Sequence, residues 1–205
     1  EANYYLGRVL YEKGQLEDAL NQLQLSLKKD NNNIFGGYIN YWLDRVYEDY
    51  RFKHADKDKA KRHYKKAKEF NSFPKDVIFR IAQYYDRGKE LEKRINIYQE
   101  GMLRFPNEPD FYLSLSNLYN YYLKDTEKAV ASLEYAIARG IKSPTVWYRL
   151  GKFYFEDEQF LNARSRYSKL FEFSKIATIF PVIYNFVADT YLEEDNIDEA
   201  IKNYS

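Results

Sequence analysis

Residue types that could carry out catalysis are scarce in this chain of 205 residues. Cysteine is absent, which excludes disulfides, thiolate metal sites and cysteine nucleophiles. The two histidines, His54 and His63, lie nine positions apart, and no further metal ligand stands at a suitable spacing. We therefore expect them to be exposed polar residues. The sequence also has no Gly-rich phosphate loop and no HExxH motif, so we expect neither a metal nor a cofactor.

Neighbouring carboxylates could act as a general acid and base, and two acidic clusters invite this interpretation. They are the Glu-Asp-Glu run at 156–158 and the Glu-Glu-Asp run at 193–195. Both fall in expected turns between helices, where acidic side chains are normally solvated. We favour solvated turns over paired catalytic acids, and we expect that this chain is not an enzyme.

The composition is typical of a folded protein, with 45% hydrophobic, 19% aromatic and 31% charged residues. Thirty-two basic residues stand against 31 acidic ones, so the net charge of +1 makes a nucleic-acid partner unlikely on overall charge. The most apolar stretch, 176–188, contains Pro181 and Asn185 and is shorter than the roughly 20 residues that a membrane span needs. The absence of cysteine suits the cytoplasm and the periplasm or envelope of a bacterium equally well.

One segment, Arg51 to Lys68, is strongly basic, with nine Lys or Arg residues against two Asp. Ala60, Tyr64 and Ala67 keep an inward helical register, so the charges are expected on the outer face of one helix. That surface is represented by Lys61, Arg62, Lys65 and Lys66. It could contact an acidic protein, lipid head groups or nucleic acid, or it could simply be a solvated convex face.

The elements that position these side chains follow an internal repeat. A small residue recurs at Ala19, Ala60, Ala129, Ala163 and Ala200, and Arg94 occupies the same slot in the third segment. The successive spacings are 41, 34, 35, 34 and 37 residues. Apolar residues at i, i+3, i+4 and i+7 predict two amphipathic helices in each segment.

The periodic pattern predicts twelve helices and no strands. Their ranges are 1–13, 16–29, 37–51, 57–70, 75–87, 90–104, 109–123, 126–139, 144–157, 160–173, 181–194 and 197–205. The five prolines all fall between the second helix of one segment and the first helix of the next: Pro74, Pro106, Pro109, Pro144 and Pro181. Proline is tolerated at a helix start, so this placement supports the predicted boundaries.

The six segments in register resemble the tetratricopeptide repeat (TPR), which has a period of about 34 residues. The resemblance implies an all-α, right-handed superhelical solenoid of antiparallel helix pairs, forming a single domain over residues 1–205. The repeats would span about 1–34, 35–73, 74–107, 108–142, 143–176 and 177–205. Asp44 in a small-residue slot of a first helix, Arg94 in the alanine slot and an insertion between Tyr47 and Ala60 depart from the pattern.

The ends of the segment also bear on this interpretation. Solenoids need polar caps at their ends, and no capping helix follows Tyr204. We therefore expect a piece of a longer chain, with flanking repeats or oligomer contacts at its ends.

By the same resemblance, the first helices line a groove in which three columns of residues can be followed. The first column is mainly aromatic: Tyr4, Tyr41, Phe79, Leu113, Tyr148 and Asn185. The second consists of hydrogen-bond donors until its last member: Arg8, Arg45, Gln83, Asn117, Lys152 and Asp189. The third is mixed: Tyr11, Glu48, Asp86, Asn120, Phe155 and Leu192.

These columns support two interpretations. The donors could hold the carbonyls or acidic side chains of an extended peptide, while the aromatic rings anchor its side chains. Alternatively, Tyr4, Tyr41 and Phe79 pack within their own repeats and the polar column is only solvated.

One specialised TPR function can be compared residue by residue. Proteins that bind the acidic C-terminus of chaperones resemble one another in a clamp of Lys, Asn and Arg. Its positions here hold Tyr4, Arg8, Trp42, Asp76 and Arg80. Only Arg80 agrees, and Asp76 would repel a terminal carboxylate, so chaperone binding of this kind is not expected.

The resemblance and the absence of an active-site motif together predict a protein-interaction scaffold or adaptor within a larger assembly. Its partners would be one or more proteins or peptides held in the groove. The alternative is a structural segment of a longer solenoid that assembles through its ends and its basic convex face, with the groove empty.

Overall fold

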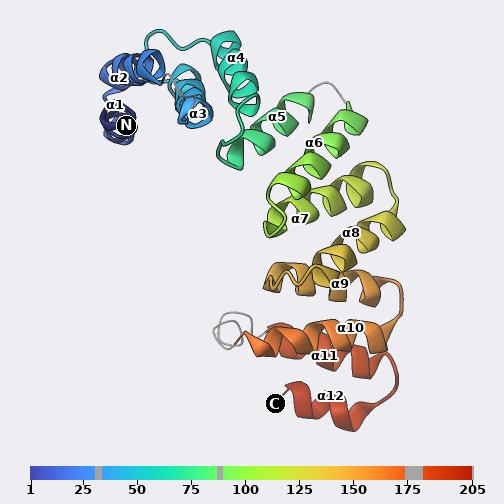
Figure 1. Cartoon of the computed structure of the whole chain (residues 1–205). Coiled ribbons are helices and arrows are strands. Elements are labelled where there is room, and N and C mark those ends of the chain that lie inside the picture. The colour runs from blue at the N-terminus through green and yellow to red at the C-terminus, as the bar shows by residue number, and fades with distance from the viewer. Residues whose placement is uncertain (31–33, 87–89, 174–181, 205) are drawn as a thin grey trace. The chain divides into compact units, whose positions relative to one another are not determined.

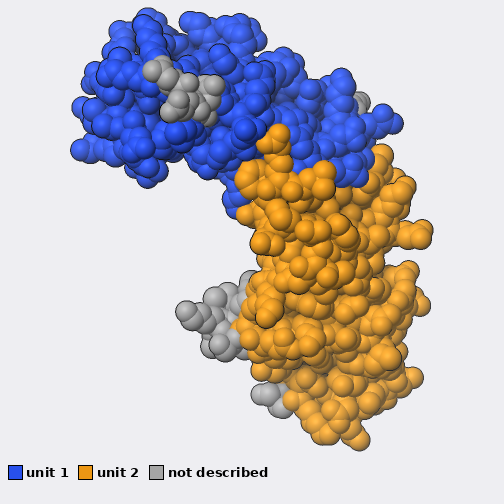
Figure 2. All heavy atoms as spheres, in the orientation of Figure 1, with its two compact units in different colours: residues 1–101 blue, residues 102–205 orange. Residues whose placement is uncertain are grey.

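Every element of secondary structure in the described residues is a helix (Figure 1). The computed structural model describes residues 1–30, 34–86, 90–173 and 182–204. The chain divides into two compact units, Glu1–Gly101 and Met102–Ser205, which Figure 2 shows in separate colours. Each unit is built from pairs of consecutive helices.

In the first unit the helices are amphipathic and alternate with short turns. They are α1 (Ala2–Glu12), α2 (Leu16–Lys29), α3 (Gly36–Glu48), α4 (Lys57–Lys68) and α5 (Asp76–Asp86), followed by α6 (Leu91–Arg104), which ends beyond the boundary of the unit. Helix α1 packs against α2 and α3 against α4, while α2 contacts α3 and α4 contacts α5. The rings of Phe79 and Tyr98, whose centroids lie 6.0 Å apart, join α5 to α6.

In the second unit the same arrangement continues through three more pairs. Its helices are α7 (Pro109–Asn117), α8 (Thr126–Ala138), α9 (Pro144–Glu156), α10 (Phe160–Ser168), α11 (Val182–Leu192) and α12 (Ile197–Tyr204). A π-helical turn, Leu118–Tyr122, extends α7, and a 3₁₀ turn, Lys169–Glu172, extends α10. Pro109 and Pro144 stand at helix starts, as the sequence predicted, whereas Pro181 lies outside the described residues.

The small-residue slots bring the two helices of a pair together. The five alanines of the second-helix slot are at most 3% exposed, and Arg94 in the same slot is 9% exposed. In the first-helix slot, a Cβ atom on Gly7 would lie 2.8 Å from the Leu23 side chain, and one on Gly151 would lie 2.5 Å from the ring of Tyr167. Glycine is therefore required at these two contacts, because a larger residue would separate the helices.

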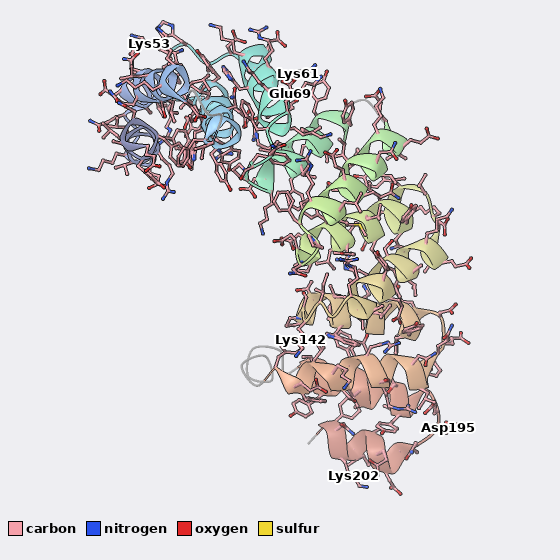
Figure 3. All side chains as sticks on the ribbon, viewed as in Figure 1. Lys53, Lys61, Glu69, Lys142, Asp195 and Lys202 are labelled. Carbon is pink, nitrogen blue, oxygen red and sulfur yellow. The ribbon has the colours of Figure 1, made fainter. Side chains whose placement is uncertain are left out.

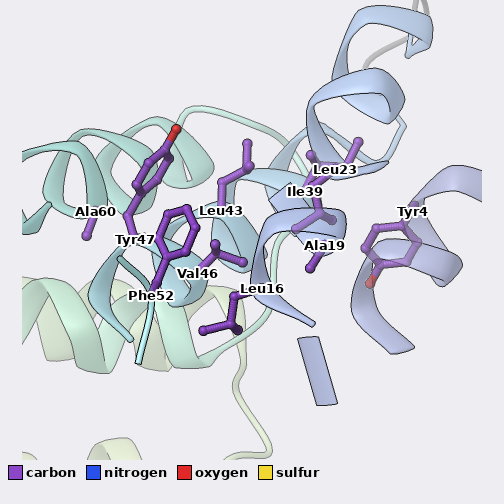
Figure 4. Close-up of a cluster of buried hydrophobic side chains, with 10 residues drawn as sticks. All are labelled: Tyr4, Leu16, Ala19, Leu23, Ile39, Leu43, Val46, Tyr47, Phe52 and Ala60. Carbon is purple, nitrogen blue, oxygen red and sulfur yellow. The ribbon is translucent and has the colours of Figure 1, made fainter. Parts of the chain in front are cut away.

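The hydrophobic core repeats with the same period. The apolar residue four positions after the alanine slot is at most 7% exposed in five repeats: Leu23, Tyr64, Tyr98, Leu133 and Tyr167. Leu23 belongs to a cluster with Ile39 and Leu43 of the next pair, which Figure 4 shows. Tyr167 packs in the same way with Ile183 and Val187. In these two repeats the helix pair buries its apolar side against the first helix of the next pair.

Two positions that are buried in other repeats are exposed in the first and the last helix pair. Leu6 is 47% exposed, although the equivalent Leu43 and Leu150 of other first helices are at most 1% exposed. Tyr204 is 45% exposed, although its five equivalents are buried. Ile197 and Ile201, on the same helix as Tyr204, are each 60% exposed.

Candidate partner-binding site

In the first unit, the predicted donors lie on three consecutive first helices. The Arg8 side chain on α1 is 44% exposed, and its Nε lies 3.5 Å from a carboxylate oxygen of Glu12. Arg45 on α3 is half-buried, and no hydrogen bond or ion pair holds it in the part of the chain that the structure describes. Gln83 on α5 is exposed. Each of these side chains can therefore turn toward a bound partner.

Aromatic rings connect the same helices. The ring of Tyr11 on α1 lies 5.3 Å from Trp42 on α3, and Trp42 lies 5.4 Å from Tyr41. The Tyr41 hydroxyl donates a hydrogen bond of 3.1 Å to Asp76 at the start of α5, and burial beside this carboxylate raises the pKa of Tyr41 to about 12. We call Tyr11, Trp42 and Tyr41 the aromatic strip. All three are half-buried, and Tyr11 and Trp42 also pack against the hydrophobic cluster of the first unit. Sequence reasoning did not assign Trp42 to the groove, although its neighbour Tyr41 was assigned.

Two other members of the aromatic column pack within the protein. Tyr4 is 5% exposed and lies 5.3 Å from the ring of Phe35, so it belongs to the core of the first unit. Phe79 is half-buried against Tyr98. For Tyr4, the structure favours the packing alternative over partner binding.

In the second unit, the predicted residues are more engaged with neighbouring side chains. The guanidinium of Arg149 on α9 donates a hydrogen bond to the side-chain oxygen of Asn117 on α7. Lys152 is exposed, with its Nζ 3.4 Å from Glu156. Three further residues, Leu113, Tyr148 and Phe155, are half-buried and pack against the hydrophobic clusters of this unit. Asn185 is exposed, and Asp189 accepts a hydrogen bond of 2.5 Å from the hydroxyl of Tyr204.

The residues of the third column differ in their exposure and in their contacts. Glu48 is exposed and bound to Arg80, at 2.6 Å from its Nη2. Asn120 accepts a hydrogen bond of 3.4 Å from Thr126. Leu192 is 46% exposed. Nothing is described of the side chain of Asp86.

Asp44, which departs from the repeat pattern, forms a buried ion pair. Its side chain is fully buried, and Arg80 of the next helix pair donates a 2.7 Å hydrogen bond to it. Burial raises the pKa of Asp44 to about 6. Because Arg80 also binds Glu48, the one residue that agrees with the chaperone-binding clamp is occupied by two carboxylates of its own chain.

The basic surface of α4 divides into two sides. Ala60, Tyr64 and Ala67 are buried, which confirms their predicted register. Lys61, labelled in Figure 3, lies with its Nζ 3.6 Å from the ring centroid of Tyr84 on α5, and Lys65 lies 5.5 Å from the same ring. Arg62 and Lys66 are exposed on the other side. No carboxylate contacts Lys57, Lys61, Arg62, Lys65 or Lys66 within the described ranges.

The prediction for His63 is wrong, whereas His54 is exposed as expected. His63 is half-buried; its ring stacks on Tyr47 at 5.6 Å, and its Nδ1 lies 2.9 Å from the side-chain oxygen of Asn40. Burial, together with nearby Lys66 and Arg62, lowers the pKa of His63 to about 4. Position 63 lies three residues after Ala60 and four before Ala67, so helical spacing could have placed it on the inward face.

Metal binding and membrane insertion are not supported by the residues that the structure describes. Among them, no group of three or more His, Cys, Asp or Glu side chains could hold a metal ion. None of the described helices is long and apolar enough to cross a membrane.

Comparison with known proteins identifies the fold of this chain. No protein-family model matches the chain, and no curated protein matches its sequence. Among solved structures, PilF of Pseudomonas aeruginosa is 16% identical, with 98% of this chain and 87% of that chain covered and a TM-score of 0.64. The C-terminal part of a TPR repeat-containing protein from Cytophaga hutchinsonii is also 16% identical, over 98% and 78%, with a TM-score of 0.63.

A third match agrees with these two. A tetratricopeptide repeat protein from Parabacteroides merdae is 16% identical, over 99% of this chain and 78% of that chain, with a TM-score of 0.59. The chain has the tetratricopeptide-repeat fold. The resemblance inferred from the spacing of small residues and prolines is thereby confirmed at the level of the fold. Solenoids of this kind build binding surfaces from equivalent residues of successive repeats.

Proposed function

We propose that this TPR chain is a non-catalytic scaffold that binds a partner polypeptide along the first helices of its repeats, within a larger assembly. The observation that supports the proposal most directly is the aromatic strip of Tyr11, Trp42 and Tyr41, flanked by Arg45, which has no ion pair among the described residues. Aromatic rings beside arginine are the residues that contribute most at protein interfaces. Arg8 and Gln83 add donors that can hold the carbonyl groups of an extended segment.

A charge-reversal experiment tests this proposal. The double variant Arg8→Glu, Arg45→Glu should recover at least about tenfold less partner in affinity purification from the native host, because two donors become carboxylates that repel peptide carbonyls. Lys28→Glu, Lys29→Glu carries the same charge change at exposed positions of α2 and serves as the control. Equal recovery with both variants would exclude Arg8 and Arg45 from the site.

A second candidate function is favoured by the exposed faces of α1 and α12. Leu6 lies where other first helices pack on the preceding pair, and Tyr204 and Ile201 lie where other second helices receive the following pair. These faces have the chemistry of the contacts inside the solenoid. We therefore propose as the alternative a structural segment that assembles through these faces and through its basic α4 surface.

The lack of cysteine makes this alternative easy to test. Leu6→Cys and Ile201→Cys, made as separate variants and mixed under oxidising conditions, should form a mixed disulfide dimer if α1 of one molecule lies on α12 of another. Val9→Cys and Asp198→Cys variants provide neighbouring positions. Failure of all combinations to cross-link would contradict this end-to-end contact and leave the groove proposal intact.

A further inference from the structure

The second repeat departs from the others where α4 faces α5. Three positions before the small-residue slot, four of the other five repeats have an apolar residue: Leu16, Leu91, Phe160 and Ile197. One position after the slot, four of the other five again have one: Leu20, Ile95, Val130 and Ile201. In α4 these two positions hold Lys57 and Lys61. A lysine at an inter-repeat contact gives up packing, so these positions are candidates for a functional role.

The facing position of α5 departs as well. Two residues after the first-helix slot, Val46, Leu118 and Phe153 are at most 5% exposed. Tyr84 at the equivalent position is 39% exposed. Apolar packing between α4 and α5 is replaced here by a cationic and aromatic contact, because the Lys61 ammonium lies over the Tyr84 ring.

The exchange leaves a pocket of about 500 Å³ between the two helices. Lys57, Lys61 and Tyr64 line it from α4, and Arg80, Gln83 and Tyr84 line it from α5. Seven of the ten lining residues are charged or polar and two are tyrosines, so the chemistry of this pocket suits a charged or polar ligand. All of these residues belong to the first unit.

The charges of this pocket favour an anion. Three carboxylates also line it: Glu48 shares Arg80 with the buried Asp44, Glu90 binds Lys93, and Asp58 has no such partner among the described residues. Against Asp58 stand Lys57 and Lys61 in the lining, with Lys65 beside Tyr84. Since none of these three cations contacts a carboxylate among the described residues, a negative ligand would meet positive charge that no ion pair neutralises.

We propose that this pocket receives acidic side chains, Asp or Glu, of a partner polypeptide. Lys57 and Lys61 bind the carboxylates, Gln83 donates to the neighbouring backbone, and the Tyr64 and Tyr84 rings contact the aliphatic part of the segment. The proposal rests on the function proposed above, that the chain binds polypeptides. It adds the chemical class of the partner's binding segment, and it adds a second point of contact to that proposed for the aromatic strip.

The test uses fluorescence anisotropy with a fluorescein-labelled peptide that contains four glutamates, and with the same peptide in which glutamines replace them. At low ionic strength the glutamate peptide should bind the whole chain, and the glutamine peptide should bind at least about tenfold more weakly. Lys57→Glu, Lys61→Glu should weaken binding of the glutamate peptide by about tenfold or more. The milder Lys57→Gln, Lys61→Gln should weaken it in the same direction if the reversed variant unfolds.

The matched control is Arg62→Glu, Lys66→Glu, which makes the same charge change four residues apart on α4 but away from the pocket. It should weaken binding less than about threefold. Equal losses in the two pairs would show a diffuse electrostatic field and overturn the pocket. Absence of binding by the wild-type chain, or tighter binding of a single-stranded oligonucleotide that is lost in the same variants, would also overturn it.

The two proposals can fail separately. Arg8→Glu, Arg45→Glu should keep its affinity for the glutamate peptide, because neither residue lines the pocket. If the peptide test fails while that variant still loses the natural partner, the pocket proposal falls and the proposed function stands.

Discussion

At the scale of single residues, two side chains make polar contacts that the repeat pattern did not predict. Asp44 takes a slot that glycine fills at Gly7 and Gly151, and its carboxylate is stabilised by Arg80 of the next pair. His63 lies on the inner side of the basic helix and contacts Asn40. The sequence revealed the anomaly at Asp44, because its position in the period is fixed. It could not reveal Arg80 as the partner, because period alone does not say which side chains meet across helices.

His63 gives the first unit a predictable pH dependence. Its pKa is lowered in the folded chain from the ordinary value of 6.5 to about 4, so protonation favours the unfolded chain. The neutral, partly buried His63 therefore contributes to the stability of the folded chain above pH 6.5. This contribution is lost as the pH falls from 6.5 toward 4. Because the ring is only partly buried, we expect a loss of about 1–2 kcal/mol over this range.

The measurement is urea unfolding followed by tryptophan fluorescence. The chain has two tryptophans, so a Trp147→Phe background leaves Trp42 as a reporter of the first unit. His63→Gln in that background should remove the part of the dependence between pH 6.5 and 4 that is due to the histidine, since glutamine does not titrate, whereas the titration of Asp44 is common to both proteins. An unchanged pH profile in His63→Gln would contradict the role of this residue.

At the scale of elements, the sequence predicted all twelve helices, and the structure differs mainly at their ends. Helix α3 ends at Glu48, three residues before the predicted end, because the carboxylate of Asp49 accepts a 2.9 Å hydrogen bond from the backbone N–H of Arg51 and stabilises a turn. The segment predicted to end at 123 changes from α to π geometry at Leu118. Periodicity identifies the helices, but such local hydrogen bonds decide where and how they end.

Side chains at equivalent positions of different helices should contribute differently to the free energy of unfolding. Tyr167 on α10 is fully buried, whereas Tyr204 in the same slot of α12 is 45% exposed. Tyr167→Ala should lower the free energy of unfolding of the second unit by about 3–5 kcal/mol, because it leaves a cavity beneath α11. Tyr204→Ala should cost less than about 1.5 kcal/mol. Chemical denaturation of both variants checks this, and comparable losses would show that slot 204 is covered in solution.

At the scale of the whole chain, a net charge of +1 conceals strong local differences. The basic residues of α4 gather in the first unit, while the acidic runs at 156–158 and 193–195 lie in exposed turns of the second. The repeat period predicted the fold class and the burial of the small-residue slots. It did not distinguish ring packing from ring exposure, as Tyr4 shows, nor did it predict a pocket created by replacing two apolar residues with lysine.

Site-specific photo-cross-linking shows most directly which helices contact a partner. A photo-reactive phenylalanine analogue is placed at exposed positions of first helices, Gln83 on α5 and Lys152 on α9, and at exposed positions of second helices, Leu25 on α2 and Tyr135 on α8. After irradiation in the native host, the account predicts adducts with the same partner from positions 83 and 152 and none from 25 and 135. Adducts from the second helices alone, with none from the first, would contradict it.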